Sequence, residues 1–463
     1  MILRYWQEVC RDLALTHFLL GYRQFGCSAT PGSGKTIFAA ATIKAMFDND
    51  MIDYVICLSP SLAVKEGSRK TFEQVLNRPM DGLFGSVGIS LTFQSLANIA
   101  ENVIQRWQKY RLAIVVDEIH HCGGQELDNA TAWSKPLIKL IDSKKDIFIL
   151  SLSGTPWRTD GAMVTTLSYN SDLKPKMHFE YGLREAIKDG VCRIPTILMV
   201  DNDNWKSTDS RRGDRYHSSL SALLTDNALS YQMVLNDEEF LKHMLDLSVT
   251  TLNRYRRDKP DAGGLIIASS ISHAKEIYNL LEKATGESPV LVTSEDKNSQ
   301  DTIVNYKSGT QKWLISVGMV TEGTDIPRLQ VCCHLSRICT ELHFRQVLGR
   351  ILRIETQYDD HTATLIMPAQ PDLFDFASRL KCDVPRAVVK INSMKAGKPN
   401  TINTFDSAPD RQFNSDKSKI EDIKLIPNGI VQWAADGVNE VVATTATISV
   451  YGRFREEVLR ISP

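Results

Sequence analysis

ATPGSGKT, at residues 29–36, is the most informative octapeptide in this chain. It follows a short apolar segment, QFGCSA at 24–29, and precedes the helix-forming run IFAAATIKAMF at 37–47. Glycines at this spacing let backbone N–H groups close around a phosphate at the positive end of a helix. A lysine at the end of such a loop reaches the outer phosphates. The pattern therefore predicts a strand, a phosphate-binding loop and a helix in succession.

The loop supplies most of the predicted cofactor-binding residues. They are Thr30, Gly32, Ser33, Gly34, Lys35 and Thr36. Lys35 is also a predicted catalytic residue, and Thr36 is a candidate ligand for Mg²⁺.

A second polar site follows another apolar run, LAIVVDE at residues 112–118. The two carboxylates of DEIHH, Asp117 and Glu118, end this predicted strand. Asp117 is expected to hold Mg²⁺ through water, and Glu118 to orient and deprotonate an attacking water molecule. Together with the loop, the pair predicts hydrolysis of a phosphoanhydride bond.

Apolar runs bounded by turn residues recur along the chain with helical patterns between them. They lie at 54–60, 112–118 and 147–156 in the first part and at 263–270, 312–320 and 331–336 in the second. Near-continuous Val, Ile and Leu are typical of strands that helices cover on both faces of a parallel sheet. Because 463 residues are too many for one hydrophobic core, we predict two α/β domains.

The divisions follow changes in composition. We expect a first domain over residues 1–195, a partly helical connector over 196–260 and a second domain over 261–370. Residues 371–463 lose the alternation of strand and helix patterns and are predicted to form a small appended region that could dock a protein partner.

Bulk properties exclude some classes of protein. Hydrophobic residues make up 43% of the chain, and the formal net charge is −1 with a pI near 6.8, so no large basic field is expected. No run of about 18 apolar residues is present. We therefore expect no membrane association and a cytoplasmic protein whose nine cysteines are reduced.

The motifs, taken in order, resemble those of superfamily 2 DExH/DEAD-box helicases of the bacterial or phage type. ATPGSGKT resembles motif I and DEIH resembles motif II. LSGTPWR at 152–158 is similar to motif III, although Gly154 replaces the usual alanine. TEGTDIP at 321–327 resembles motif V, RQVLGRILR at 345–353 resembles motif VI, and LRYWQ at 3–7 resembles the element that recognises adenine.

This resemblance, which covers roughly residues 1–370, implies two tandem RecA-like P-loop domains with ATP and Mg²⁺ in the cleft between them. Arg353 is the predicted arginine finger, which stabilises the charge that builds on the γ-phosphate. Arg350 would contact a phosphate or a carboxylate. The resemblance adds Gln346 and both arginines to the catalytic set, Gln7, Gly323 and Asp325 to the nucleotide-binding set, and Ser153 and Thr155 as residues that couple hydrolysis to movement.

Nucleic-acid contacts in the family are made largely by hydroxyl and amide groups. The matching positions are Pro60, Ser61, Thr92, Gln94, Ser269, Ser270 and Thr321. A serine or threonine after a strand can instead cap a helix. Two basic clusters in the connector, one at 211–215 and one at 254–257, could contact a duplex or form a solvated surface.

Two functional hypotheses remain open. The first is an ATP-dependent helicase or translocase that moves along nucleic acid, with DNA favoured over RNA by the resemblance alone. The alternative is a nucleic-acid-triggered ATPase sensor or assembly subunit of a repair, restriction or phage-defence complex, with its partner bound through residues 371–463.

Overall fold

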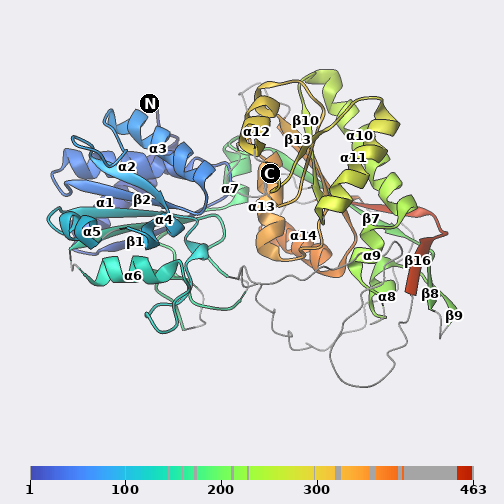
Figure 1. Cartoon of the computed structure of the whole chain (residues 1–463), viewed down its shortest axis with the longest axis horizontal. Helices are drawn as coiled ribbons and strands as arrows, with labels where there is room; N and C mark the ends of the chain where they lie inside the picture. The colour runs from blue at the N-terminus through green and yellow to red at the C-terminus, as the bar shows by residue number, and fades with distance from the viewer. Residues whose placement is uncertain are drawn as a thin grey trace.

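The computed structural model describes residues 2–99, 101–143, 146–158, 160–171, 175–209, 213–226, 229–296, 298–318, 325–354, 361–383, 388–390 and 446–460. Two α/β domains lie side by side, with the short helix α7 (Leu183–Lys188) between them (Figure 1). Both domains contain the predicted parallel sheets.

The first domain is a parallel six-stranded sheet with the order β3-β2-β4-β5-β1-β6. Its strands are β1 (Gln24–Ala29), β2 (Tyr54–Ser59), β3 (Gly88–Thr92), β4 (Leu112–Asp117), β5 (Ile147–Ser153) and β6 (Phe179–Tyr181). Strands β2, β4 and β5 are buried along their whole length, as the continuous apolar runs predicted. The predicted strand before the phosphate-binding loop is β1.

Helices cover both faces of this sheet. One core contains side chains of α1 and α2 with alternate residues of the central strands, and a second core contains α4, α5 and α6 with the intervening residues. The helices are α1 (Tyr5–Leu19), α2 (Lys35–Asp48), α3 (Leu62–Leu76), α4 (Phe93–Ala97), α5 (Glu101–Trp107) and α6 (Ser134–Asp142), with the 3₁₀ turn η1 (Ile119–His121) after β4. The three-layer arrangement leaves the carboxyl ends of the strands for a site.

The second sheet has eight strands in the order β11-β12-β10-β13-β14-β7-β17-β15. The strands are β7 (Ile194–Asn202), β10 (Gly263–Ala268), β11 (Val290–Val292), β12 (Trp313–Ser316), β13 (Leu329–Leu335), β14 (Thr362–Pro368), β15 (Val388–Lys390) and β17 (Phe454–Arg460). The first six strands in the order are parallel, and β17 and β15 add antiparallel strands at one edge.

Helices of the second domain follow its strands. They are α8 (Leu220–Leu224), α9 (Tyr231–Leu235), α10 (Glu238–Asp258), α11 (Ile271–Thr285), α12 (Ser299–Ser308), α13 (Glu341–Ile351) and α14 (Pro371–Asp383). The helical pattern expected near residues 237–258 is α10, whose apolar side chains, including Phe240 and Met244, pack into the second domain's core.

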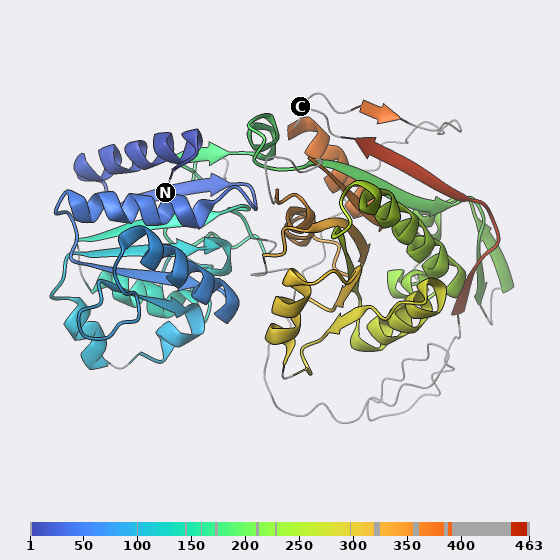
Figure 2. The ribbon, with the colours of Figure 1, turned by 90° about the horizontal axis from the view of Figure 1, so that it is seen from above.

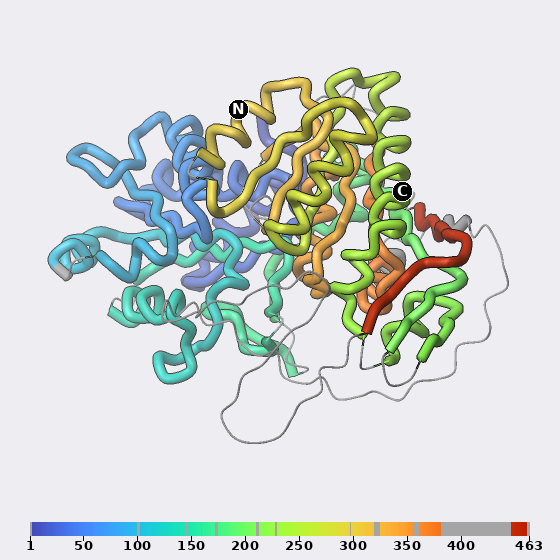
Figure 3. Tube along the Cα trace, turned by 45° about the vertical axis from the view of Figure 1, so that its right-hand side comes forward, coloured from blue at the N-terminus to red at the C-terminus, as the bar shows by residue number. Residues whose placement is uncertain are grey.

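The expected connector, 196–260, and the expected appended region, 371–463, both contribute strands to the second domain. Strand β7, which begins at the predicted start of the connector, pairs with β14 inside the sheet. From the region 371–463, β17 pairs with β7, and β16 (Ala446–Val450) joins β8 (Trp205–Asp209) and β9 (Gly213–His217) in a small antiparallel sheet. Figure 3 shows these C-terminal strands beside β7 and β8. The physical reason is that β17 supplies the backbone partners for one edge of β7.

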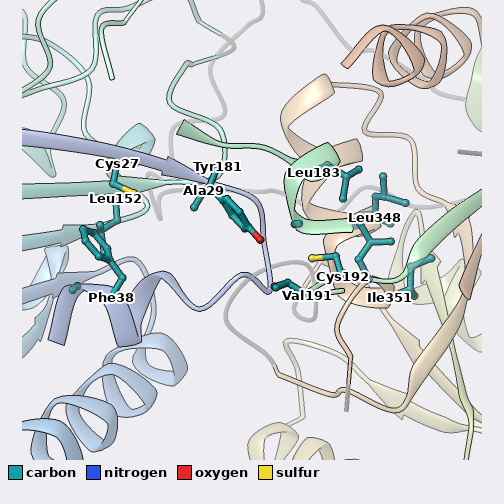
Figure 4. Close-up of a cluster of buried hydrophobic side chains, with 14 of the residues drawn as sticks. Cys27, Ala29, Phe38, Leu152, Tyr181, Leu183, Val191, Cys192, Leu348 and Ile351 are labelled. Carbon is teal, nitrogen blue, oxygen red and sulfur yellow. The ribbon is translucent and has the colours of Figure 1, made fainter. Parts of the chain in front are cut away.

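An apolar core runs from one domain into the other. Ala29 and Tyr181 of the first sheet continue through Leu183 and Val191 to Leu348 of α13 (Figure 4). This continuity holds the domains together at the end of the cleft where α7 lies. In the described part of the chain, no helix is both long and apolar enough to cross a lipid bilayer.

Candidate functional site

The strands of the first sheet end toward the second domain (Figure 2). Strand β5 lies between β1 and β4, so the phosphate-binding loop and the carboxylate pair are at the same sheet edge, one strand apart. The carboxyl edge of a parallel sheet is where ligands of α/β proteins bind. The topology therefore brings the two strongest sequence signals together.

Two glycines give the loop its shape. Gly32 and Gly34 have φ angles of 83° and 96°, in the left-handed region that favours glycine. A Cβ atom on Gly34 would lie 2.6 Å from Gln7 Nε2. A Cβ on Gly32 would lie 3.1 Å from Arg353 Cγ, a side chain of the other domain. The loop is thus closely packed on both sides.

Lys35 begins α2 and points back over the loop. Its Nζ donates to Ala29 O at 3.0 Å and lies 3.7 Å from Glu118 Oε1. Only 9% of the residue is exposed. The ammonium group therefore lies between the loop and the carboxylates, where a phosphate oxygen could replace its present partners.

Asp117 and Glu118 are close but differ in environment. Burial, and next the charge of Glu118, raise the pKa of Asp117 to about 7, although Lys35 acts in the opposite direction. A bound divalent cation would favour the carboxylate form. The oxygen donors of Asp117 and Thr36 suit Mg²⁺, and Ser33 Oγ is a buried hydroxyl with no hydrogen-bond partner among the described residues. These features fit a metal-bound phosphate.

Glu118 has an unusual backbone conformation. Its φ of 51° and ψ of 54° place a non-glycine residue in the left-handed region. Such strain costs about 1–3 kcal/mol and persists where the surroundings fix it. Here Ser153 Oγ donates to Glu118 Oε2 at 3.5 Å, and His120 Nδ1 lies 3.4 Å from the same oxygen.

Ser153 also connects the carboxylate to the end of β5. Its Oγ lies 3.0 Å from His120 Nδ1 and accepts a hydrogen bond from Thr155 N at 3.0 Å. Arg158 Nη1 then donates to His120 O at 2.7 Å. The sequence predicted Ser153 and Thr155 but missed His120 and Arg158. The histidine directly after the carboxylate pair and the arginine ending LSGTPWR were the available signals.

Side chains at the start of α1 hydrogen-bond to the backbone of the phosphate-binding loop. Gln7 Nε2 donates to Gly34 O at 3.0 Å, and Arg4 Nη1 donates to Ser33 O at 2.6 Å. Gln7 is 2% exposed and contacts the loop backbone, whereas Arg4 lines the cavity beside it. Sequence reasoning singled out Gln7 and missed Arg4, which precedes it by one helical turn.

The second domain completes a cavity of about 450 Å³. Its walls include Lys35, Thr36, Asp117 and Glu118 of the first domain with Asp325, Gln346, Arg350 and Arg353 of the second. Arg353 Nη1 pairs with Asp325, and Lys307 Nζ lies 3.5 Å from the same carboxylate. Burial raises the pKa of Asp325, but these two cations more than offset it, so the pKa lies below its usual value.

The domains touch closely beside this cavity. A Cβ atom on Gly349 would lie 2.5 Å from Pro31 Cβ. The guanidinium of Arg345 lies 5.5 Å from the ring centroid of Trp157. The predicted loop and motif VI therefore face each other directly, with α13 presenting Gly349 to the loop.

The residues predicted to contact nucleic acid have several different structural roles. Pro60 lines the cavity described above. Ser61, Thr92 and Ser270 accept backbone N–H groups as the N-caps of α3, α4 and α11, the competing interpretation of these hydroxyls.

Ser269 is buried, with Gln232 Nε2 at 2.9 Å and His273 Nδ1 at 2.8 Å. Gln94 is exposed on α4. Thr321 and Gly323 lie outside the described residues, as do Arg211 and Arg212 of the first basic cluster.

Two other arginines of the basic clusters have specific partners. Arg215 pairs with Asp226 at 3.1 Å. Arg256 donates to two backbone carbonyls at 2.6 Å and 3.2 Å. Both side chains therefore have structural contacts within the second domain.

Two parallel-sheet domains, with a phosphate loop and a carboxylate pair on one and an arginine pair facing them on the other, form the arrangement of a two-domain P-loop protein. Residues 1–158 match the model of the family "Type III restriction enzyme, res subunit". An uncharacterized protein of Mycobacterium leprae (strain TN) is 31% identical over 398 residues, which are 82% of this chain and 64% of that protein. The chain thus spans less than two thirds of this relative.

Other comparisons agree on the fold. "Putative ATP-dependent helicase IRC3" of Saccharomyces cerevisiae is 22% identical, with 77% of this chain and 50% of that protein covered. The fragment structure of "a putative HsdR subunit of a type I restriction enzyme" from Vibrio vulnificus YJ016 superimposes with a TM-score of 0.54 at 17% identity, with 81% of this chain and 65% of that one covered. The fold is that of two tandem RecA-like domains, and residues 1–158 are similar to the restriction-enzyme family named above.

Proposed function

We propose that this protein hydrolyses ATP in the cleft between its two domains and uses the resulting closure and opening to move along nucleic acid. The observation that carries the proposal is the 450 Å³ cavity lined by Lys35, Glu118 and Arg353 together. A volume of this order falls within the range of cofactor sites. The first domain contributes the general base, Glu118, and the second contributes the arginines that face it.

Each side chain has a role set by its position. Lys35 and the loop N–H groups would bind the phosphates, and Thr36 and Asp117 would hold Mg²⁺, which supplies charge neutralisation when bound. Glu118 would accept the proton of the attacking water. Arg350 and Arg353 would stabilise charge on the transferred phosphoryl group. Because Arg353 now pairs with Asp325, it must exchange this carboxylate for the phosphate as the cleft closes.

Gln7 and Arg4 would place the base of the nucleotide beside the loop, since both residues hold the backbone at Ser33 and Gly34. Hydrogen bonds connect Glu118 to Ser153 and Ser153 to Thr155. A shift of Glu118 on loss of the γ-phosphate would therefore move the end of β5. DNA is the favoured track because the matched family and the HsdR neighbour carry the names of restriction enzymes.

The test is ATP turnover with and without single-stranded, duplex and forked DNA and RNA. Wild type is compared with Lys35→Ala, Glu118→Gln and Arg353→Ala. We expect DNA to stimulate wild type and all three variants to lose turnover. Glu118→Gln should retain nucleotide affinity because the phosphate loop is intact. Full turnover by Arg353→Ala would contradict a site shared between the domains.

A second function is favoured by one observation: the structural neighbour from Vibrio vulnificus is named as a subunit of a restriction enzyme. In this alternative the protein is a nucleic-acid-triggered ATPase sensor or assembly subunit, with a partner bound through residues 371–463. Strand-displacement and triplex-displacement assays distinguish the two. A motor displaces one or both structures, whereas a sensor hydrolyses ATP slowly and displaces neither.

A further inference from the structure

A second basic hollow lies at the opposite end of the first sheet from the nucleotide cavity. It has a volume of about 520 Å³. Its lining residues are His17, Tyr22, Arg23, Gln24, Ser168, Lys176 and His178. Four of these seven side chains are basic types and none is acidic. Because β1 runs from Gln24 to the phosphate loop, the hollow is about 20 Å from that loop, the span of a six-residue strand.

The imidazole of His178 is fixed in one neutral form. Gly26 N donates to His178 Nδ1 at 2.9 Å, so the ring proton is on Nε2. Burial, and next the positive charges of His17 and Lys176, lower the pKa of His178. The ring therefore offers an N–H donor from the wall of the hollow.

His17 is placed between two other rings. It stacks on Tyr22 with centroids 4.5 Å apart and an interplanar angle of 16°, and it meets His178 edge-on at 4.5 Å. Its Nε2 lies 2.9 Å from Gln24 O, which requires the proton on Nε2. Tyr22 is 58% exposed, so the ring face that does not stack on His17 is accessible.

The two cations of the hollow are available to a ligand. Lys176 is exposed. Arg23 lies over the Phe148 ring at 4.5 Å and pairs with Asp146 at 3.4 Å, with 41% of the arginine side chain and 72% of the aspartate side chain exposed. Exposed pairs of this kind contribute about 0–1 kcal/mol, so a phosphate can replace the carboxylate at little cost.

We propose that this hollow binds one nucleotide unit of a single-stranded nucleic acid, with the phosphate between Arg23 and Lys176 and the base stacked on Tyr22. Basic side chains beside accessible aromatic rings are the common means of binding single strands without sequence preference. The inference rests on the proposed function and adds to it a contact for the strand beyond the cleft.

The experiment measures binding of a fluorescein-labelled 30-residue oligothymidylate by fluorescence anisotropy over a series of KCl concentrations. Wild type is compared with Arg23→Gln/Lys176→Gln, with Tyr22→Ala and with the control Lys139→Gln, an exposed lysine on α6. Loss of the one phosphate that these two cations neutralise should reduce the magnitude of the slope of log K against log salt by about 0.7. Loss of the ring should weaken binding by roughly 5- to 150-fold, the equivalent of about 1–3 kcal/mol.

ATP turnover without nucleic acid should be the same in all four proteins, since the hollow is remote from the cleft. Pocket variants that bind like wild type and Lys139→Gln would overturn the inference while leaving the proposed function intact. A wild type that binds no strand would overturn both. Calorimetric titration with thymidine monophosphate tests whether the hollow binds a free nucleotide instead of a strand. Binding of the free nucleotide that Tyr22→Ala abolishes, with strand affinity unchanged, would assign the hollow to a free nucleotide and overturn the inference.

Discussion

Single residues at the ends of strands carry much of the site. Ser59 and Ser153 end β2 and β5 of the same sheet, and both are buried. Ser153 Oγ contacts Glu118, His120 and Thr155, whereas Ser59 Oγ has no hydrogen-bond partner among the described residues. The same residue type at equivalent positions therefore has two different energetic roles.

This contrast predicts different outcomes for two serine-to-alanine variants. Ser153→Ala removes the acceptor of Thr155 N–H and a partner of His120, which should cost about 1–3 kcal/mol. It should also reduce stimulation of ATP turnover by DNA, since Glu118 loses a contact. Ser59→Ala removes no hydrogen bond and should leave thermal stability nearly unchanged. Thermal unfolding and turnover with and without DNA check both expectations, and equal shifts for the two variants would contradict them.

The sequence predicted the local motifs of the site better than the partners of individual side chains. The loop at 29–36 was predictable because its glycines have only one backbone geometry that suits a phosphate. The roles of Ser61, Thr92 and Ser270 stayed ambiguous because the N-cap position and a nucleic-acid contact require the same hydroxyl after a strand. Arg4 was missed because the resemblance to the adenine-recognition element pointed to its glutamine, Gln7, alone, although both side chains donate to loop carbonyls.

At the scale of elements, the parallel strands that helices bury on both faces were predicted, whereas β17, which pairs antiparallel with β7, was missed. Strands such as β2 and β4 are nearly continuous apolar runs because helices cover both faces. Strand β17 reads FREEVLR, in which charged residues interrupt the apolar pattern. Strand β7 was divided by the prediction because Pro195 suggested a boundary, although the pairing of β7 with β14 continues through that residue. The side chains of β17 are mostly exposed or half-buried, so its sequence carries a weaker apolar signal.

The pairing of β17 with β7 implies that the second domain depends on its C-terminal strand. Leu459 is 4% exposed and belongs to the core that spans both domains, whereas its neighbour Arg460 is exposed. Leu459→Ala should destabilise by about 2–4 kcal/mol through lost packing, and Arg460→Ala by less than about 0.5 kcal/mol. The midpoint of thermal unfolding provides the measurement. Equal midpoints for the two variants would mean that β17 does not contribute to the stability of the domain.

At the scale of the whole molecule, the two domains meet in two ways. Apolar side chains join them beside α7, while the polar cavity separates them at Lys35 and Arg353. Burial of apolar area does not depend on direction, whereas transfer of the Arg353 guanidinium from Asp325 to a phosphate requires an exact distance. The apolar contact can therefore act as the fixed part of a hinge, and the polar cavity as the part that opens and closes.

Gly349 tests this arrangement because it is the point of closest approach between α13 and the phosphate loop. A methyl group there would lie 2.5 Å from Pro31 Cβ and 2.9 Å from Pro31 Cγ, so the domains would have to move apart. Within the helix alone, Gly→Ala is favourable by about 1 kcal/mol, and the variant should remain folded. We expect Gly349→Ala to retain binding of a fluorescent ATP analogue and to lose turnover by on the order of 100-fold, the effect of a displacement of about 1 Å at a catalytic group. Turnover equal to wild type would show that hydrolysis does not require the domains to approach this closely, and Arg353 would then lose its assigned role.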